Sequence, residues 1–536
     1  MIRINELKLP LDYTENDLKK AAANAIKVDP SKISSVTLAK RSVDARKKDS
    51  IKFTAAVDVA LSVDENSVLR RCKNNKAAIH TPYVYDLPNE KPLAKRPVVV
   101  GAGPGGLFAA LILAQCGQQP ILIERGKSVD DRTADVALFW NGGKLDTNSN
   151  VQFGEGGAGA FSDGKLNTGT KDSRSRKVLE EFVSHGAPEE ILWAAKPHIG
   201  TDRLKPTVKS IRNDIISLGG EVRFETTLTK LDIKNGRLVG IEVESNGKTD
   251  TIETDAVILA LGHSARDTFN MLYNSGFAME AKPFSVGVRI EHLQTKINKA
   301  QYGAFYDHPK LGAADYKLSV HLKSGRGVYT FCMCPGGYVV AAASEENTVV
   351  TNGMSEFARD SKNANSALLV GVTPDDFGSD SPLAGIEFQR KIERAAFKAG
   401  GKTYRAPVSR AGDLLAKKKT TALGSVIPSY KPGYEFAQAD EYLPDFVTNS
   451  IREALPLLGG RLKGFDDPDA VITGAETRSS SPVRILRGET LEALGITGVY
   501  PCGEGAGYAG GIMSAAADGI RCAEALLKNA PKRLQD

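Results

Sequence analysis

The chain has 536 residues, of which 41% are hydrophobic and 25% are charged, and its net charge at pH 7 is +6. The length excludes one ordinary domain and predicts two to four, and the composition is that of a soluble globular protein. The N-terminus lacks the apolar core of a signal peptide, and the six cysteines form no regular framework, which argues against a secreted disulfide scaffold and favours a cytoplasmic protein.

Residues 1–90 predict a small α+β module, which a linker over residues 91–97 joins to the rest of the chain. Thr14 and Asp17 form a capping-box pattern at the start of a helix. The polar run 41–48 is expected to lie between strands. The module is expected to contain strands over 2–9, 33–40 and 51–61 and a helix over 15–26.

The basic excess of the chain lies in its N-terminal part. Residues 1–96 contain 19 Lys and Arg against 12 Asp and Glu, whereas the remainder contains 51 against 52. Such an excess suits a polyanionic partner such as RNA, or it is the solvated face of a small domain. The module lacks the interleaved aromatic residues on which nucleic acid bases stack.

The segment 98–106 predicts an apolar strand, a tight glycine turn and the start of a helix, and residues 121–124 predict a second strand that ends in an acid. In a dinucleotide site the glycines permit the turn, the approach of the pyrophosphate and close helix packing, while the acid binds ribose hydroxyls. The alternative is an ordinary strand-turn-helix of a parallel sheet. Residues 98–117 are uncharged and long enough for a membrane span, but the glycines favour a buried strand and helix. The candidate cofactor residues here are Gly101, Gly103, Pro104, Gly105, Gly106, Glu124 and Arg125.

Residues 153–165 contain five glycines and predict a loop that lies against a ligand, with Gly156 and Gly157 as contact candidates; the alternative is a plain flexible loop. A helix is expected over 203–218. An apolar strand over 256–262 is expected to be buried on both faces. Four more strands, with Asn-Gly turns at 235 and 246, are expected over 221–225, 228–233, 238–244 and 250–254.

The motifs around residues 98–124, 255–262 and 499–504 occur in an order that resembles glutathione-reductase-type flavoproteins. The blocks 282–292, 332–337 and 476–480 are similar to those of the uncharacterised bacterial FAD-dependent dehydrogenases, also called NAD(FAD)-utilising dehydrogenases. The resemblance covers about residues 95–536, and the N-terminal module is similar to the extension in that group.

The resemblance implies an α/β fold in which a Rossmann-like FAD-binding domain carries an inserted α+β substrate domain. The expected boundaries are residues 98–280 and 466–536 for the FAD-binding domain and 281–465 for the insertion. The resemblance also implies that the loop 153–165 lines the flavin ring and that the helix at Gly511 points at its pyrimidine edge, where negative charge develops on reduction. The cofactor contacts it adds are Leu228 at the adenine, Gly262, Gly503, Glu504, Gly511, Ile512 and Met513.

The family motif usually carries Asp where this chain has Glu504, so the charge is retained on a longer side chain. A second GxGxxG unit with a downstream acid does not occur, which argues against a separate NAD domain but leaves NAD(P)H as a transient electron donor over the flavin. The histidines lack metal-ligand spacing, so we expect no metal. Cys332 and Cys334 are interpreted as structural cysteines rather than a redox pair.

Four residues are candidates for catalysis, each with a structural alternative. His263 follows the buried strand 256–262 and is expected near the cofactor. Arg289 and His292 would position or protonate a substrate, or else they are alternating residues of a strand edge. Arg478 would clamp a carboxylate, or it forms an ion pair with an acid such as Glu476.

The sequence therefore predicts a cytoplasmic FAD-dependent oxidoreductase in which a small-molecule substrate exchanges a hydride with flavin N5 between the FAD-binding domain and the insertion. The alternatives are a flavin monooxygenase and a flavin-containing RNA-associated protein that binds through the basic N-terminal module. The sequence does not indicate the substrate or the oligomeric state.

Overall fold

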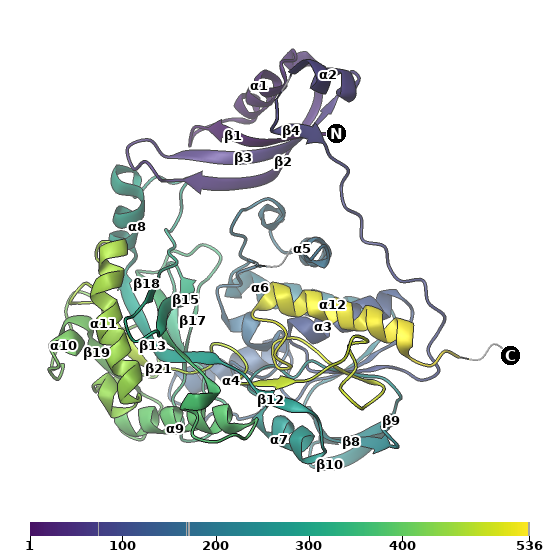
Figure 1. The fold of residues 1–536 in the computed structure, drawn as a ribbon, viewed down its shortest axis with the longest axis vertical. Helices are drawn as coiled ribbons and strands as arrows, with labels where there is room; N and C mark the ends of the chain where they lie inside the picture. Colours follow the sequence, from purple (N-terminus) through teal and green to yellow (C-terminus); the bar gives the residue numbers. More distant parts are fainter. Residues whose placement is uncertain (73, 168, 170–171, 534–536) are drawn as a thin grey trace.

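Three sheets organise the molecule in the computed structural model, which describes residues 1–72, 74–167, 169 and 172–533. Figure 1 shows a small sheet at the N-terminal end, a parallel sheet beneath helix α12 and a larger sheet beside helix α11. Within the described residues, no helix combines the length and the apolar character that crossing a membrane requires.

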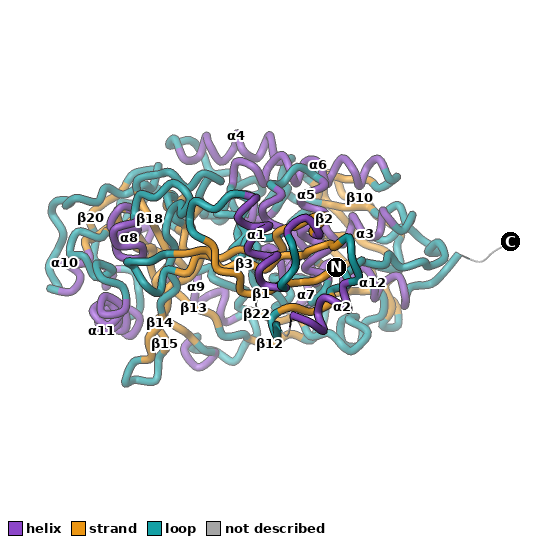
Figure 2. Tube along the Cα trace, turned by 90° about the horizontal axis from the view of Figure 1, so that it is seen from above, coloured by secondary structure: helices purple, strands orange, loops and turns teal. Residues whose placement is uncertain are grey.

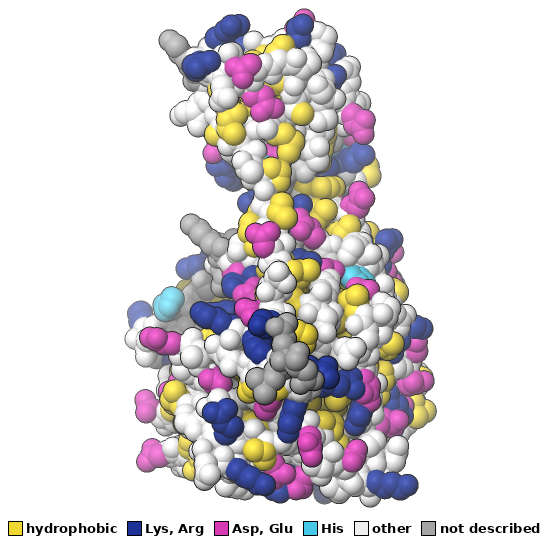
Figure 3. All heavy atoms as spheres, turned by 90° about the vertical axis from the view of Figure 1, so that its right-hand side faces the viewer, with side chains coloured by type: hydrophobic (Ala, Val, Ile, Leu, Met, Phe, Trp, Pro, Cys, Tyr) yellow, Lys and Arg dark blue, Asp and Glu magenta, His cyan; other side chains and the backbone are white. Residues whose placement is uncertain are grey.

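The N-terminal sheet has the strand order β2-β3-β1-β4 and carries two helices. In Figure 3 it forms a narrow upper lobe above a wider body. The capping box of Thr14 and Asp17 is confirmed at the start of α1. The elements of this lobe are β1 (Ile2–Leu9), α1 (Glu15–Ile26), β2 (Ile33–Asp44), β3 (Lys52–Leu61), α2 (Glu65–Cys72) and β4 (Ala77–Ile79).

The polar run 41–48 does not lie wholly between strands, as the sequence suggested, because β2 continues to Asp44. The reason is local packing: the Arg41 guanidinium lies 4.7 Å from the ring centre of Phe53 and 4.5 Å from that of Trp193. An arginine between two aromatic faces suits a sheet surface that is covered by another segment. Backbone hydrogen bonds between Arg41 and Trp193 and between Ala195 and Arg41 join the lobe to the body.

The parallel sheet has the strand order β23-β11-β5-β6-β7 and confirms the strands expected to start at residues 98 and 121. The strand expected over 256–262 forms over the shorter range 257–259. The residues of this sheet alternate between two apolar clusters. Val99 and Ile258 pack with the helices, whereas Val98 and Val257 pack with the antiparallel sheet β10-β9-β8. The strands are β5 (Val98–Val100), β6 (Ile121–Ile123), β7 (Glu221–Arg223), β8 (Thr226–Lys234), β9 (Arg237–Ser245), β10 (Lys248–Glu253), β11 (Val257–Leu259) and β23 (Val499–Pro501).

Helices α3 and α12 lie side by side on one face of the parallel sheet, and the three antiparallel strands lie on the other (Figure 1). The helix expected over 203–218 is confirmed as α6. The two Asn-Gly turns are also confirmed, since Asn235 and Asn246 have φ values of 52° and 51°. The helices of this region are α3 (Pro104–Gln115), α4 (Val129–Trp140), α5 (Arg174–Ser184), α6 (Thr201–Ser217), α7 (Arg266–Asn274) and α12 (Ile512–Asn529).

The third sheet has the order β14-β15-β18-β13-β21-β19-β20 and is mostly antiparallel. Figure 2 shows its elements at the opposite end of the molecule from α3 and α12. Its elements are β13 (Phe284–Leu293), α8 (Gln294–Tyr302), β14 (Ser319–His321), β15 (Gly327–Cys334), β18 (Asn363–Val372), α9 (Ala384–Ala399), β19 (Ala406–Arg410), α10 (Ala411–Leu415), β20 (Tyr434–Phe436), α11 (Asp445–Arg461) and β21 (Val471–Glu476).

Two short pairs complete the structure: β12 (Met279–Ala281) with β22 (Val483–Ile485), and β16 (Tyr338–Ala341) with β17 (Thr351–Met354). Strand β21 belongs to the seven-stranded sheet, although the sequence analysis placed residues 466–536 with the FAD-binding domain. All six of its residues are buried, so its apolar run has the same appearance as a central strand of a parallel sheet.

Candidate functional site

A cavity lies where the strands of the parallel sheet end, and residues of two strands of the seven-stranded sheet also line it. Thr226, Thr227 and Leu228 line one end of it. Cys332 and Glu476, which belong to the seven-stranded sheet, also line it. Its lining residues run from Val100 to Ala515, so the cavity joins segments that are more than 400 residues apart in the sequence.

The glycine turn after β5 brings backbone atoms to the cavity wall. A Cβ at Gly101, where φ is 102°, would lie 2.4 Å from the carbonyl oxygen of Ala260, and one at Gly106 would lie 1.7 Å from that of Gly101. Helix α3 then begins at Pro104, and its N-cap Gly103 offers no side-chain acceptor. The first N–H groups of the helix are thus left for a ligand, and the dipole favours an anion there.

Glu124 lies at the end of β6 and is held by three backbone amides. Its carboxylate accepts hydrogen bonds from Ala102 (2.7 Å), Gly126 (2.9 Å) and Gly154 (2.9 Å). The residue lines the cavity but also ties the glycine turn to the loop at Gly154, a role that the sequence analysis did not identify. Next to it, the Arg125 guanidinium lies 4.5 Å from the ring centre of Phe153 and donates to Thr268 (3.0 Å).

The glycine-rich loop is shaped by Arg132, a residue that the sequence analysis missed. Its buried guanidinium donates to four backbone carbonyls, at distances between 2.7 and 3.2 Å: those of Asn150, Val151, Gly154 and Glu155. Burial lowers the pKa of Arg132 to about 10, so it stays charged at neutral pH. The loop is thereby fixed rather than freely flexible, and Gly157 packs against Gly103, with only 3.0 Å between the position of its absent Cβ and the Gly103 Cα.

A second helix, α12, begins at the same cavity. Its N-cap Gly511 has a φ of 106°, and Gly511 and Ile512 line the wall. The Glu504 carboxylate faces this helix start and accepts a weak hydrogen bond from the Gly511 N–H at 3.4 Å. Burial raises the pKa of Glu504 to about 7, so its protonation changes near neutrality.

Three predicted cofactor residues do not line the cavity: Gly106, Gly156 and Met513. Gly106 is required for packing between α3 and the turn, as described above. Gly156, where φ is 84°, packs towards Val208. Met513 is 2% exposed and packs in the helix cluster, because the second residue of α12 points into the core rather than along the helix axis.

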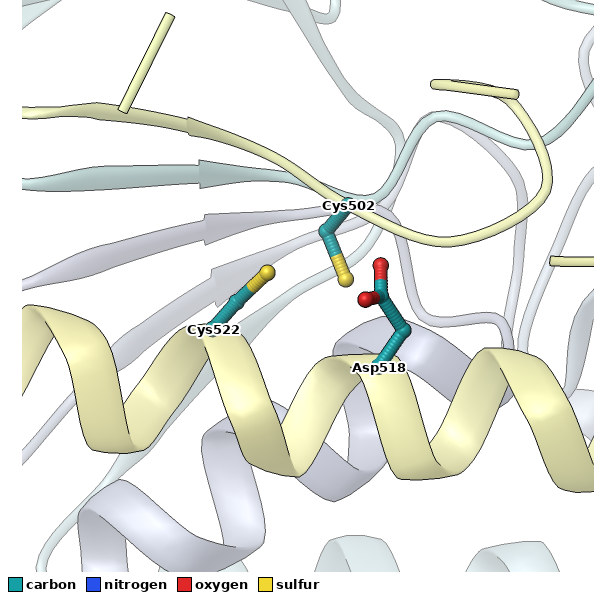
Figure 4. Close-up of side chains that lie close together, drawn as sticks. All are labelled: Cys502, Asp518 and Cys522. Carbon is teal, nitrogen blue, oxygen red and sulfur yellow. The ribbon is translucent and has the colours of Figure 1, made fainter. Parts of the chain in front are cut away.

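Asp518 and Cys522, both on α12, point towards Cys502, which follows β23, and the three side chains lie close together (Figure 4). The Asp518 carboxylate accepts both N–H groups of Arg487 (2.7 and 3.0 Å) and the N–H of Gly503 (2.8 Å). A guanidinium thus already occupies the position that a cation would take. We therefore assign this cluster the role of fixing the Gly503 turn rather than that of a metal site.

The structure divides the four catalytic candidates into two pairs. His263 and Arg478 line the cavity. Burial and the charges of Arg478 and Arg266 lower the pKa of His263 to about 3, so it is neutral at physiological pH. Arg478 is buried and bonded to Glu393 (3.1 and 3.2 Å), Ser264 (3.0 Å) and Ser344 (2.6 Å), which matches the structural alternative of an ion pair.

Arg289 and His292 do not line the cavity and are not placed to contact a substrate there. Arg289 lies behind Glu476, to which it forms two hydrogen bonds of 2.9 and 3.0 Å, so it positions that carboxylate. His292 is 1% exposed, bonded to the carbonyl of Phe465 (2.7 Å) and packed on its ring. Arg289 and His292 both lie on β13, whose first nine residues are all buried, and neither side chain reaches the cavity.

Three segments match described families. Residues 95–277 match the family described as pyridine nucleotide-disulphide oxidoreductase. Residues 283–479 match the one described as FAD-dependent protein, C-terminal domain-like. Residues 1–60 match a domain of unknown function, DUF8436. The first two matches cover the parallel-sheet region and the seven-stranded sheet, the two regions that line the cavity.

A protein of Clostridium beijerinckii, described as uncharacterized, is 50% identical over 540 residues, which cover 98% of each chain. Among solved structures, a triple mutant of the flavin-dependent brominase Bmp2 is 13% identical with a TM-score of 0.37, over 81% of this chain and 80% of that one. The FAD complex of the glycerol-3-phosphate dehydrogenase from Bacillus halodurans is 12% identical with a TM-score of 0.35, over 83% and 67%.

Proposed function

Since the chain belongs to the FAD-dependent oxidoreductases, we propose that it transfers a hydride between a small-molecule substrate and atom N5 of bound FAD. The observation that carries the proposal is the cavity that residues of the parallel-sheet region and of the seven-stranded sheet line together. The carboxyl ends of parallel strands are the usual place for a dinucleotide, and a region between two sheets is a usual place for a substrate.

The residues present fit FAD. The free N–H groups of α3 suit the pyrophosphate, and the open start of α12 suits a group that becomes negative on reduction. Oε1 of Glu124 accepts two backbone N–H groups and Oε2 accepts one, so Oε2 retains a lone pair for a ribose hydroxyl. We assign the cofactor contacts to the cavity-lining residues Gly101, Gly103, Pro104, Gly105, Glu124, Arg125, Gly157, Leu228, Gly262, Gly503, Glu504, Gly511 and Ile512.

Bound FAD supplies a centre that accepts or gives two electrons. The side chains of the protein hold or move protons around this centre and position the substrate. Neutral His263, whose Nδ1 lies 3.0 Å from the Ser264 hydroxyl, offers a hydrogen bond but no imidazolium proton. Glu504, with a pKa of about 7, is suited to hold or release a proton at the start of α12.

We assign the substrate to the end of the cavity lined by Cys332, Asn352 and Glu476. Arg289 fixes the Glu476 carboxylate from behind and also donates to Asn352 (3.1 Å). Both polar groups are therefore held in place before a ligand arrives, which favours binding. NADH or NADPH is the electron donor that we include in the proposal, as a transient ligand over the flavin.

The test begins with full-length purified protein, which is expected to be yellow and to release FAD, not FMN, on heating. Anaerobic addition of NADH or NADPH is expected to bleach the flavin. A colourless protein that FAD cannot reconstitute would refute cofactor binding. Flavin that neither nucleotide nor any candidate substrate reduces would refute hydride transfer, and an oxygenated product formed in air would identify a monooxygenase.

A glycine substitution separates cofactor binding from folding. A Cβ at Gly103 would meet only the Gly157 Cα, at 3.8 Å, and φ at Gly103 is −74°. Gly103→Val is therefore expected to fold but to obstruct the pyrophosphate site, which lowers the flavin content of the purified protein. Gly460→Ala is the matched control, because a Cβ there has no atom within 4 Å.

A further inference from the structure

Lys165 lies at the end of the glycine-rich loop and lines the cavity. Its ammonium group bonds to the carbonyl oxygen of Met333, the residue after Cys332, so it belongs to the end of the cavity that we assign to the substrate. An antiparallel bridge to His198 fixes the Lys165 backbone, while its side chain is 28% exposed. A lysine that is held in this way and open to a cavity can present its ammonium group to a ligand.

The Lys165 ammonium group has one N–H that its neighbours leave unused. An ammonium group has three N–H donors. One is directed at the Asp163 carboxylate, at a distance of 2.8 Å, and another at the carbonyl oxygen of Met333. Among the described residues, Lys165 has no third acceptor. The remaining N–H is therefore available to an acceptor on a ligand.

The positive charge of Lys165 is also not balanced by its neighbours. Asp163 is 1% exposed and accepts two hydrogen bonds from the Arg359 guanidinium (2.6 and 2.9 Å), so Arg359 already balances its charge. Burial alone would lower the pKa of Lys165, but the charge of Asp163 outweighs burial and raises it, so Lys165 stays protonated. Two cations around one carboxylate leave one positive charge at the cavity wall. Such a wall favours an anionic ligand.

Asn352 supplies a second donor at the same end of the cavity. Its Oδ1 accepts hydrogen bonds from Arg289 (3.1 Å) and from the Gly353 N–H (2.8 Å), which fixes the orientation of the amide. Its Nδ2 has no acceptor in the part of the chain that the structure describes, and Asn352 lines the cavity. Arg289 also donates to the carbonyl oxygen of Cys332 (3.0 Å). The amide of Asn352 and the ammonium group of Lys165 are thus both linked to the last residues of β15.

The other ionic groups of the cavity wall limit the charge of the ligand. Glu476 is balanced by Arg289, and Arg478 forms an ion pair with Glu393. Glu504, with a pKa of about 7, is partly ionised at neutral pH and would repel a second negative charge. A group with one negative charge on two oxygens therefore suits two separate donors better than a dianion such as a phosphate monoester does. A carboxylate is such a group.

Phe331 adds an apolar surface next to these donors. It directly precedes Cys332 on β15, is 41% exposed and lines the cavity. An aromatic ring that is open to a cavity offers a large apolar area to a ligand. The ligand is therefore expected to combine a carboxylate with an apolar part.

We propose that the substrate is an organic monocarboxylate, whose carboxylate binds the Lys165 ammonium and the Asn352 amide while its apolar part packs on Phe331. This assignment deepens the proposed function and rests on it, because the substrate is the molecule that exchanges a hydride with the flavin. Lys165 and Asn352 are binding residues in this assignment and take no part in the hydride transfer itself.

The experiment compares ligands of similar shape and different charge on the flavin-loaded full chain. Hexanoate and phenylacetate are titrated beside their uncharged amides, hexanamide and phenylacetamide. Binding is measured from the thermal midpoint and from the change in flavin absorbance. The carboxylates are expected to bind about tenfold more tightly than the amides, because a hydrogen bond between charged groups contributes more than a neutral one. Phenyl phosphate and phenethylamine test a dianion and a cation.

Variants assign the preference to Lys165. Lys165→Met removes the charge at similar length and is expected to fold, because Asp163 keeps Arg359 as its partner. It should weaken phenylacetate about tenfold and leave phenylacetamide unchanged, whereas a purely structural role would weaken both alike. Lys165→Arg is expected to restore most of the preference. Lys196→Met is the matched control, because Lys196 also pairs with an aspartate, at 2.7 Å, but is 67% exposed and lies outside the cavity.

Three results would overturn the proposal: no preference for acid over amide in the unaltered chain, tighter binding of phenyl phosphate or phenethylamine than of either carboxylate, or a preference that Lys165→Met retains. The first two need no variant, so the proposal stays testable if Lys165→Met does not fold. If the flavin is reduced normally but acid and amide bind equally, the substrate class fails alone. If flavin is absent or cannot be reduced, the proposed function fails, and the thermal midpoints still show whether the cavity binds a carboxylate.

Discussion

The two sides of the cavity are built from different parts of the polypeptide. On the parallel-sheet side, backbone atoms and helix ends form the wall, as at Gly101, Gly103 and Gly511. On the side of the seven-stranded sheet, buried charged side chains support the wall, as in the pairs Arg289–Glu476 and Arg478–Glu393. A backbone wall depends on the absence of side chains, whereas a wall of side chains depends on their buried charges.

The two walls are therefore expected to respond differently to substitutions. The backbone side should tolerate changes of charge but not of volume in its glycine turn, because Gly101 and Gly106 leave no room for a Cβ. The side-chain side should tolerate modest changes of volume but not the loss of one charge, because its partners would stay buried without compensation. Three substitutions test this contrast.

The largest effect is expected for Glu393→Gln on α9. Glu393 is fully buried and accepts hydrogen bonds from Arg266 (2.8 and 2.9 Å) and Arg478 (3.1 and 3.2 Å). Burial raises its pKa, but the two guanidiniums outweigh burial and hold it well below the usual range. Loss of this charge should lower the free energy of unfolding by about 3–5 kcal/mol, measured as a fall in the thermal midpoint.

Glu387→Gln is the matched control on the same helix. Its side chain is 57% exposed and pairs with Arg390 at the surface, so the expected change is about 0–1 kcal/mol. Because the pKa of Glu393 is depressed in the folded state, its contribution is present above the usual pKa of Glu and is lost as pH falls below it. Two results would contradict the ion-pair account. One is an equal thermal midpoint in the two variants, and the other is a loss of stability at low pH that is unchanged in Glu393→Gln.

Gly106→Ala tests the backbone side and is expected to have the next largest effect. The new Cβ would lie 1.7 Å from the carbonyl oxygen of Gly101, so the turn and α3 must separate. Overpacking of this kind typically destabilises by about 1–3 kcal/mol, and the displaced turn should also lose its flavin. Both are measured on the purified protein, as the thermal midpoint and the ratio of flavin to protein absorbance.

Gly460→Ala again provides the comparison, because both glycines are helical and only one is crowded. In open space the change to Ala is expected to leave flavin content unaltered and to raise helix stability slightly, by about 0.5–1 kcal/mol at most. If Gly106→Ala kept its flavin and its midpoint, the close contact between α3 and the turn would not be what requires glycine there.

The same contrast explains what could be predicted from the sequence. The glycine turn and Glu124 directly follow the strands that present them, so their spacing located them, whereas the start of α12, ten residues after β23, was expected from the family resemblance. Arg132 and Glu393 gave no such signal, because their partners are backbone carbonyls or residues about 85 to 127 positions away. The same limit applies to His292, whose place on a strand could be predicted but not which neighbours would bury it.

The smallest effect is expected for Glu504→Gln, and it depends on pH. Burial raises the pKa of Glu504 from 4.5 to about 7, so the folded state holds the proton more tightly than the unfolded state. Protein without flavin should therefore lose stability as pH rises from about 5 to about 7, by about 1–2 kcal/mol, because the carboxyl is partly solvated. Glu504→Gln should remove this loss, which thermal midpoints across the pH range would measure.

Glu253→Gln is a suitable control, since the Glu253 side chain is 84% exposed and its substitution should leave the slope with pH unchanged. The outcome decides which kind of wall Glu504 belongs to. If the dependence of the thermal midpoint on pH disappears only in Glu504→Gln, then Glu504 is a side-chain proton site within the backbone wall. It lies next to the helix start, where charge would develop. A slope that persists in both variants means that the carboxyl is solvated enough to stay ionised, and its role is then limited to its hydrogen bond with Gly511.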